Sequence, residues 1–454
     1  MAHRDLTEGP VWRALAHVSA PMSLGILAVL SVGIVDAYFL GQLGADPLAA
    51  VGYIYPVTAA LTSLSIGLSA GANAAISQGL GRRDDAATIH RLGLHAIGLG
   101  LGLSLFVAGL FALAYPLIFG AMGASSAVQA QIDAYVPLWS LSFPFLVVMM
   151  ITNALFRAHG DASFASLFMI LAAVVNIALN PVLIFGAFGL DGLGTAGAAL
   201  ATLVGRVLAA TAALTFAWRY GYLDWCGRLL KDLGDSLKQV TAVGAPAAFS
   251  NAINPAGMAL VTAAVATLGD AAVAGFGAAT RVQSVAIVVL LALSAGIGPV
   301  VGQNWGADKP ARAQCAVLQS WAFCVAYGAV LGLGLSVFAD PISAAIASGS
   351  EAAAFTADYL RVVGWSLFGY GMLVTANAAM NGRSKAVYSM TLSLSRIFAV
   401  YLPLAWGGVF LFGYPGILAA AVIANIAAVG GALYFCHRAS LLPQRDDLRG
   451  ALVT

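Results

Sequence analysis

Long apolar stretches alternate with short polar segments along the whole chain. Each stretch is close to the ~20 residues that a helix needs to cross ~30 Å of hydrocarbon, and none shows the apolar–polar alternation that is typical of barrel strands. The pattern therefore predicts an all-α polytopic membrane protein with twelve transmembrane helices. They are expected at residues 14–39, 48–78, 92–116, 134–156, 162–188, 193–218, 240–267, 272–304, 313–338, 356–380, 386–410 and 415–437.

The composition supports the same class. The chain of 454 residues is 61% hydrophobic and only 9% charged, whereas a soluble globular domain contains about a quarter charged residues. The first apolar stretch continues to Phe39. That is too long for the core of a signal peptide, so we expect an uncleaved first span. The net charge of +2 gives no reason to expect a nucleic-acid partner.

The distribution of basic residues predicts the orientation. All but four of the 21 Lys and Arg residues lie in the two tails and in alternate loops, and the intervening loops, such as 117–133 and 339–355, contain none. Because cytoplasmic loops carry the excess of basic residues, we expect both termini in the cytoplasm. The four exceptions lie inside predicted spans and have no assigned role: Arg206, Arg281, Arg361 and Arg396.

The two halves of the chain repeat one another. LGADPLAAVG at 43–52 matches LGDAAVAGFG at 268–277, and LSAGANAAISQGLG at 68–81 matches LSAGIGPVVGQNWG at 293–306, both at the same offset of 225. Farther along, Pro181 pairs with Pro403 and Gly194 with Gly416 at an offset of 222. We therefore predict two six-helix bundles related by a pseudo-two-fold axis along the membrane normal. The expected parts are an N-terminal lobe at 1–220, a cytoplasmic linker at 221–239, and a C-terminal lobe with its tail at 240–454.

A single acidic residue lies several residues inside a predicted span. All of the 19 acidic residues except Asp36 fall in loops, tails or within about a turn of a predicted helix end. A charge near the bilayer centre costs ~2.5–3.5 kcal/mol on the insertion scale, and a low-dielectric environment favours the protonated form of a carboxyl group. Asp36 is therefore a predicted coupling site that loads a proton or binds a cation. The alternative is an interfacial aspartate without that role.

Uncharged polar residues lie at a similar predicted depth. Asn176 and Asn180 are one turn apart on one face of the fifth span, and Thr202 is in the sixth. Asn153, in the fourth, lies nearer the cytoplasmic end. Amides and a hydroxyl near a carboxyl group can bind its proton, water or a metal ion, although such residues also join helices by hydrogen bonds. Pro21 in the first span is a candidate hinge, since proline kinks a helix, with a static kink as the alternative.

The sequence gives no support for an enzyme. Catalysis would need a nucleophile with a base or a metal cluster, and the six histidines show no ligand spacing. We therefore expect no metal site and no cofactor other than the coupling ion, which is H+ or, as an alternative, Na+. A channel is an alternative to a transporter, but it would not explain why one half of the chain contains a single titratable group inside its spans.

Two motifs resemble those of the multidrug and toxic compound extrusion (MATE) family. LFRAHGD at 155–161 is similar to the family's segment after helix 4, and SAGIGPVVGQNWGADKPARA at 294–313 is similar to its Gly-Gln-x-x-Gly-Ala segment after helix 8. The resemblance implies two six-helix lobes in a V around a central cavity, and drug efflux by antiport with protons or sodium ions. The family's helix 1 aspartate falls on Asp36. Its first-lobe polar cluster, for cation coupling and substrate binding, falls on Asn153, Asn176, Asn180 and Thr202.

Within that family the chain resembles the DNA-damage-inducible F (DinF) branch. The sodium-coupled branch has carboxylates in helices 7 and 10, where this chain has AFSNAINP and VTANAAMN without an acid. The resemblance thus favours a proton-coupled multidrug exporter of amphipathic, cationic compounds that works as a monomer among membrane lipids. Sodium coupling and the flipping of lipid-linked oligosaccharide are the alternatives.

Overall fold

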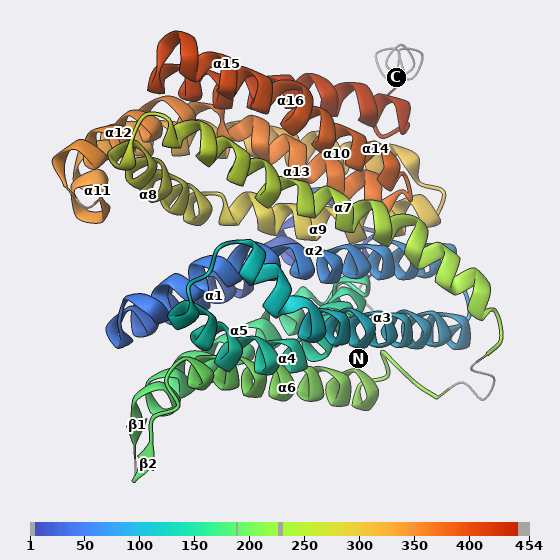
Figure 1. The fold of residues 1–454 in the computed structure, drawn as a ribbon. Helices are drawn as coiled ribbons and strands as arrows, with labels where there is room; N and C mark the ends of the chain where they lie inside the picture. The colour runs from blue at the N-terminus through green and yellow to red at the C-terminus, as the bar shows by residue number, and fades with distance from the viewer. Residues whose placement is uncertain (1–4, 188, 226–229, 348, 444–454) are drawn as a thin grey trace. The chain divides into compact units, whose positions relative to one another are not determined.

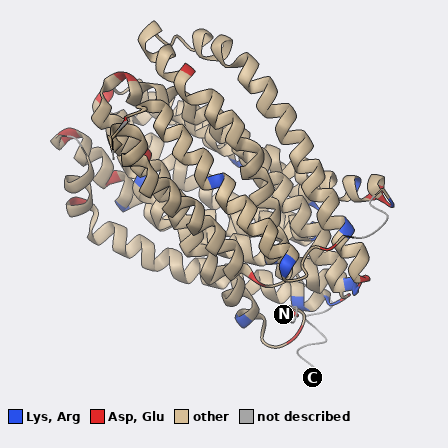
Figure 2. Cartoon of the chain, turned by 90° about the horizontal axis from the view of Figure 1, so that it is seen from below, with Lys and Arg blue, Asp and Glu red and all other residues tan. Residues whose placement is uncertain are grey.

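The computed structural model describes residues 5–187, 189–225, 230–347 and 349–443, and most of them are helical (Figure 1). In the described part of the chain, twelve helical segments are long and apolar enough to cross a membrane. Figure 2 shows charged residues mainly at helix ends and in the connections, and few along the helices. The predicted all-α fold is confirmed, and the chain is a multi-pass membrane protein.

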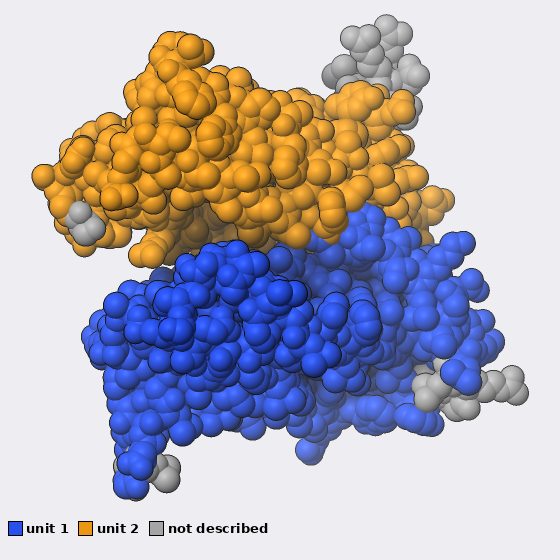
Figure 3. Space-filling view, viewed as in Figure 1, with its two compact units in different colours: residues 1–5, 21–248 blue, residues 6–20, 249–454 orange. Residues whose placement is uncertain are grey.

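The contacts divide the chain into two compact units, shown in different colours in Figure 3. Unit 1 comprises residues 1–5 and 21–248, and unit 2 comprises residues 6–20 and 249–454. Both divisions fall inside helices, α1 (Val11–Leu43) and α7 (Leu233–Ala266), so each of these helices begins in one unit and ends in the other. The predicted lobes divide instead at the linker, because hydropathy marks where a helix ends and not what it packs against.

Unit 1 is built around α4. In the most apolar 18-residue segment of α4, 67% of the residues are buried, whereas the corresponding share in α1, α2, α3, α5 and α6 is 22–39%. The helix α4 is therefore the central helix of the unit. The side chain of Ser125 accepts a hydrogen bond from the Val128 backbone N–H at the start of α4. The remaining elements are α2 (Ala45–Arg82), α3 (Ala86–Ala121), α4 (Ser126–Ala158), α5 (Ala162–Phe185), α6 (Thr195–Arg219) and a short antiparallel hairpin of β1 (Gly186–Ala187) and β2 (Leu190–Asp191).

Unit 2 contains more interrupted spans. The stretch predicted at 272–304 divides at Ile287, the tenth span contains a 3-10 turn, and the eleventh contains a π-helical segment. None of the three interruptions contains a proline, so proline does not mark them, and hydropathy alone does not show where the helix type changes. The elements are α8 (Asp270–Ala286), α9 (Val288–Gly306), α10 (Pro310–Val337), α11 (Ala339–Ile346), α12 (Ser350–Val363), η1 (Gly364–Ser366), α13 (Leu367–Gly382), α14 (Ala386–Leu394), η2 (Ser395–Tyr401), α15 (Leu402–Phe412) and α16 (Tyr414–Arg438).

The sequence repeat reappears as a repeated packing contact. In unit 1, a Cβ at Gly71 would collide with the backbone of Val240 and lie 3.0 Å from Gly244 N. In unit 2, a Cβ at Gly296 would collide with Ser19. Gly71 and Gly296 are related by the repeat offset, and so are Ser19 and Gly244. Small residues thus let the first part of α7 approach α2, and the first part of α1 approach α9.

Each of the two family-like motifs fixes a neighbouring segment. Gln303 and Asn304 bond the backbone of Leu6, with Leu6 N donating to Gln303 Oε1 at 2.9 Å and Asn304 Nδ2 donating to Leu6 O at 3.1 Å. In unit 1, the Tyr222 hydroxyl donates to Asp161 Oδ2 at 2.5 Å. Burial and then the Asp161 carboxylate raise the pKa of Tyr222. Both motifs therefore hold a segment that is distant in the sequence beside the turn in which they lie.

Candidate coupling site

Packing of α1 against α5 places Asp36. A Cβ at Gly25 of α1 would lie 3.1 Å from Ser166 of α5, and farther along both helices Asp36 reaches Asn180. The two contacts occur in the same order on both helices, so α1 and α5 run in the same direction here. About 16 Å of helix rise separates the two contacts on α1.

Packing of α6 against α5 places Thr202. A Cβ at Gly205 would lie 2.7 Å from the carbonyl oxygen of Ala172, and Gly197, two turns earlier on α6, meets the backbone of Leu183. The order of these contacts shows that α5 and α6 are antiparallel. Glycines at this spacing let the two backbones approach closely, and Thr202 then lies opposite Asn176.

A continuous chain of hydrogen bonds joins the three helices. Asn180 Nδ2 donates to Asp36 Oδ1 at 2.5 Å and to Asn176 Oδ1 at 3.2 Å. Asn176 Nδ2 donates to Thr202 Oγ1 at 3.0 Å, and that hydroxyl donates to the Ala198 carbonyl at 3.1 Å. Asn176, Asn180 and Thr202 are buried, and Asp36 is half-buried. The structure thus brings together four of the residues that the sequence predicted at one depth.

Two residues that the sequence did not assign also belong to this cluster. Arg206, one turn beyond Thr202 on α6, interacts electrostatically with Asp36; its Nη1 donates to Ser142 Oγ at 2.7 Å and its guanidinium lies 5.3 Å from the Trp139 ring centre. Tyr135 of α4 interacts with both Asp36 and Arg206. The spacing of Thr202 and Arg206, which places both on one helix face, is the signal that could have identified Arg206.

Two predicted residues are separate from the hydrogen-bond chain. Asn153 is fully buried in α4, and neither its Oδ1 nor its Nδ2 has a hydrogen-bond partner among the described residues. It therefore has no bond to Asn176, Asn180 or Thr202. Pro21 lies in α1 at the residue where unit 1 begins its share of that helix. The proposed roles of Asn153 and Pro21 stay predictions.

Asp36 is less exposed than the other acidic residues that lie well inside helices. Because α4 and α12 begin earlier than predicted, Asp133 and Asp358 lie about two turns inside them, but both side chains are exposed. In the described ranges, no three His, Cys, Asp or Glu side chains are grouped to hold a metal ion. The oxygen atoms available to a coupling ion are the Asp36 carboxylate and Asn180 Oδ1, which is buried and accepts no hydrogen bond from the described residues.

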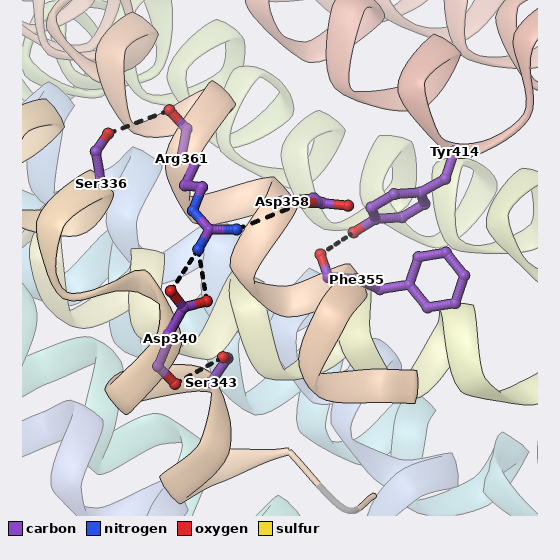
Figure 4. Close-up of polar contacts among 7 residues, drawn as sticks. All are labelled: Ser336, Asp340, Ser343, Phe355, Asp358, Arg361 and Tyr414. Carbon is purple, nitrogen blue, oxygen red and sulfur yellow. Dashed lines mark hydrogen bonds and ion pairs between the residues drawn. The ribbon is translucent and has the colours of Figure 1, made fainter. Parts of the chain in front are cut away.

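Of the intramembrane arginines in unit 2, Arg361 has an evident structural partner. Figure 4 shows its guanidinium on Asp340 of α11, with Asp358 of α12 nearby. Nη2 lies 2.5 Å from both Asp340 oxygens, and Nη1 lies 3.8 Å from Asp358. This exposed cluster ties α11 to α12. Arg281 of α8 is also exposed.

Comparison with known proteins agrees with this architecture. The family model MatE matches residues 21–182 and again residues 246–406. The two matches begin at Pro21 and Pro246, which are themselves related by the repeat offset, so they coincide with the repeat. Together they cover more than half of the chain, and the chain therefore belongs to the MATE family of transporters.

Characterised relatives and solved structures of the family cover most of the chain. An FAD transporter of Shewanella oneidensis is 30% identical over 434 residues, 95% of each chain. The multidrug export protein MepA of Staphylococcus aureus is 27% identical over 307 residues, 66% of each chain. The Vibrio cholerae MATE transporter VcmN in its bent form has a TM-score of 0.87 at 27% identity, covering 95% of this chain and 98% of that one. A MATE structure in complex with MaL6 has a TM-score of 0.90 at 26% identity, covering 97% and 99%.

Proposed function

We propose that the protein exports small amphipathic compounds in exchange for protons, with Asp36 as the group that carries the proton. The observation that supports this most directly is the half-buried Asp36 carboxylate, held by Asn180 at the end of a hydrogen-bond chain through α5 and α6. An ionisable residue inside a membrane span is costly and commonly marks an ion pathway.

Protonation would reorganise this chain of hydrogen bonds. The ionised carboxylate accepts the N–H of Asn180. Once protonated, the Asp36 hydroxyl becomes a donor and needs an acceptor, and Asn180 Oδ1 is buried with no bond of its own from the described residues. Proton loading would thereby change how α1 is held against α5. Antiport requires only that proton and substrate favour different conformations, and Pro21, where the units divide α1, is the proposed hinge.

The proposed substrates are cationic amphipathic drugs, because a carboxylate in the site attracts a positive charge. The relative MepA, a multidrug export protein, supports this class. A second candidate substrate is a flavin dinucleotide, which the FAD transporter of Shewanella oneidensis supports over nearly the whole chain. Flipping of lipid-linked oligosaccharide has weaker support, because Arg281 and Arg361 are exposed and Arg361 pairs with carboxylates.

Sodium is the alternative coupling ion, since the Asp36 carboxylate and Asn180 Oδ1 are both oxygen ligands. Efflux from proteoliposomes, driven separately by a pH gradient and by a sodium gradient, tests the choice. We expect the pH gradient alone to drive export of a cationic dye. Export that follows only the sodium gradient would contradict proton coupling.

We further propose that the protein works as a monomer in a bacterial inner membrane with both termini in the cytoplasm. The distribution of Lys and Arg between alternate loops supports the orientation. Cysteine labelling at Ser350, in a loop predicted outside, against Arg83, in a loop predicted inside, would check the orientation in intact cells.

A further inference from the structure

Arg396 lies in unit 2, and none of the described residues offers it a carboxylate partner. Arg396 Nη2 donates to Asn425 Oδ1 at 3.0 Å, and Nη1 donates to Asn254 Oδ1 at 3.4 Å. Both acceptors are uncharged. Arg396 Nε is buried and has no hydrogen-bond partner among the described residues. A guanidinium has five N–H donors, and these two bonds use two of them, so further N–H groups on Nη1 and Nη2 remain for a ligand.

The surroundings of Arg396 are aromatic. Its guanidinium lies 5.3 Å from the ring centre of Tyr370 and 6.0 Å from that of Tyr401. Within the described ranges, the ionisable groups that interact with it electrostatically are Tyr359, Tyr370 and Tyr401. Tyrosine rings can hold a cation at their faces, but they do not neutralise its charge. Arg396 is half-buried, so a ligand can reach part of the side chain.

Local structure holds this arginine in place. Arg396 is the second residue of the π-helical segment η2, and such segments are rare and occur frequently at functional sites. On α7, Asn254 and Gly257 lie on one face. A Cβ at Gly257 would collide with the side chain of Ile397, so the glycine lets α7 approach η2 beside Arg396. On α16, Asn425 is fixed by donating to Ser366 Oγ at 2.9 Å.

Arg361 of the same unit shows what a structural arginine looks like here. It is exposed and is neutralised by Asp340 and Asp358 (Figure 4). Arg396 is less exposed than Arg361, and the described residues give it no counter-charge. A buried charge without compensation costs several kcal/mol, roughly, even after relaxation. The two amides and the tyrosine rings position Arg396 but leave its charge uncompensated.

We propose that Arg396, with Asn254 and Asn425 as positioning residues, binds a phosphate or carboxylate group of a ligand, and that Tyr370 flanks an attached ring. Planar guanidinium forks match the oxygens of both groups in a bidentate manner. Every residue of this site belongs to unit 2, so the site does not depend on Asp36 or on the coupling ion. The anionic group belongs either to a transported compound or to a lipid headgroup.

Riboflavin and riboflavin 5′-phosphate test the site, because they share a fluorescent ring and differ by one phosphate. Equilibrium dialysis with the purified full chain in detergent measures both affinities. We expect the parent protein to prefer the phosphate form by about tenfold or more, since charge-assisted hydrogen bonds are the stronger class. Arg396→Gln should lose this preference and keep its affinity for riboflavin, and Arg396→Lys should keep part of the preference.

The control variant is Arg361→Gln, which should retain the preference. Dialysis measures binding without an imposed ion gradient, so a failure of proton coupling would leave the phosphate preference unchanged. If Arg396→Gln does not elute as a single folded species, inorganic pyrophosphate competing with riboflavin 5′-phosphate on the parent protein provides the test. A parent protein that binds both flavins equally, or that binds neither flavin nor pyrophosphate, would overturn the proposal.

A binding measurement in the presence of lipids distinguishes the two sources of the phosphate group, a transported compound and a lipid headgroup. Riboflavin 5′-phosphate binding is measured in mixed micelles with phosphatidylglycerol or with phosphatidylcholine. Displacement by phosphatidylglycerol alone, lost in Arg396→Gln, assigns the site to an anionic headgroup. Binding that is insensitive to both lipids assigns it to a transported anion.

Discussion

The same three repeat-related helices carry opposite charges in the two units. In unit 1, α1, α5 and α6 surround the carboxylate of Asp36 with amides and a hydroxyl. In unit 2, their counterparts α7, the α14–η2–α15 span and α16 surround the guanidinium of Arg396 with amides. The repeat places Val261, which is fully buried, at the position equivalent to Asp36. Duplication thus kept the helices and changed the chemistry that they present.

This difference shows that the repeat specifies packing and not function. The contact of Gly71 recurs at Gly296, at the repeat offset, because small residues allow two helices to approach closely. The polar residues do not recur, because each polar cluster must satisfy its own hydrogen bonds. A carboxylate that changes its proton occupancy and a guanidinium that remains charged are suited to different tasks.

The largest expected effect is at the carboxylate of unit 1. Asp36→Asn keeps the shape and the neighbours of the side chain but removes its ability to gain and lose a proton. Export of a cationic dye driven by a pH gradient in proteoliposomes should fall to the background rate. Asp133→Asn, an exposed aspartate inside α4, is the matched control and should export like the parent. Parental export by Asp36→Asn would remove the coupling role.

The next test places an acid at the corresponding position of unit 2. Val261→Asp buries a carboxylate in unit 2. The residue equivalent to Asn180 in this unit is Leu402, so the new carboxylate has no amide at that position to donate a hydrogen bond to it. An uncompensated buried charge costs ~3–5 kcal/mol. The thermal midpoint in detergent, followed by tryptophan fluorescence, should fall by many degrees. Val261→Thr, of nearly the same shape and uncharged, should lower it much less. Equal midpoints for the two variants would show that unit 2 can accommodate a carboxylate.

A smaller effect is expected from glycines that bring helices together in each unit. In Gly205→Ala the added carbon meets the Ala172 carbonyl oxygen, and the backbone cannot turn away, so we expect a loss of ~1–3 kcal/mol. In Gly257→Ala it meets the Ile397 side chain, which can change rotamer, and the loss should be smaller. Denaturation midpoints of the two variants measure the difference. Gly102→Ala, with open space around it in α3, should not lower the midpoint, because alanine is the better helix former.

The smallest expected effect concerns the turn between α4 and α5. Tyr222→Phe removes the hydrogen bond to Asp161 and should cost ~1 kcal/mol at neutral pH. Because the folded protein raises the pKa of Tyr222, the stabilisation is complete below the ordinary tyrosine pKa of ~10 and is lost as the pH rises through the raised value. The gap between parent and variant should therefore narrow only in strongly alkaline solution. A constant gap would contradict this explanation.

Hydropathy, charge and the repeat were sufficient to predict the fold class. They could not predict the breaks at Ile287, Gly364 and Ser395, because no proline marks these positions and packing selects the helix type there. The early starts of α4 and α12 were missed for the opposite reason, since their first turns are too polar to count as a span.

The candidate site was predicted in part. Asp36, Asn176, Asn180 and Thr202 share one depth, and depth follows from counting residues along each helix. Arg206 was not assigned, because its relation to Asp36 depends on how α6 is rotated, and that rotation is set by Gly197 and Gly205. Asn153 was included through family resemblance, and the structure shows no hydrogen bond from it to the other four among the described residues.

The exchange of helix ends between the units has a consequence for dividing the polypeptide. A fragment ending at residue 220 would contain residues 6–20, which complete unit 2, and would lack residues 233–248, which complete unit 1. The complementary fragment would have the reverse defect. Neither piece is then a self-sufficient folding unit, whereas two pieces made in the same cell could restore each other. On this division the covalent connection at the linker is less important for assembly than the one helix segment that each piece supplies to the other.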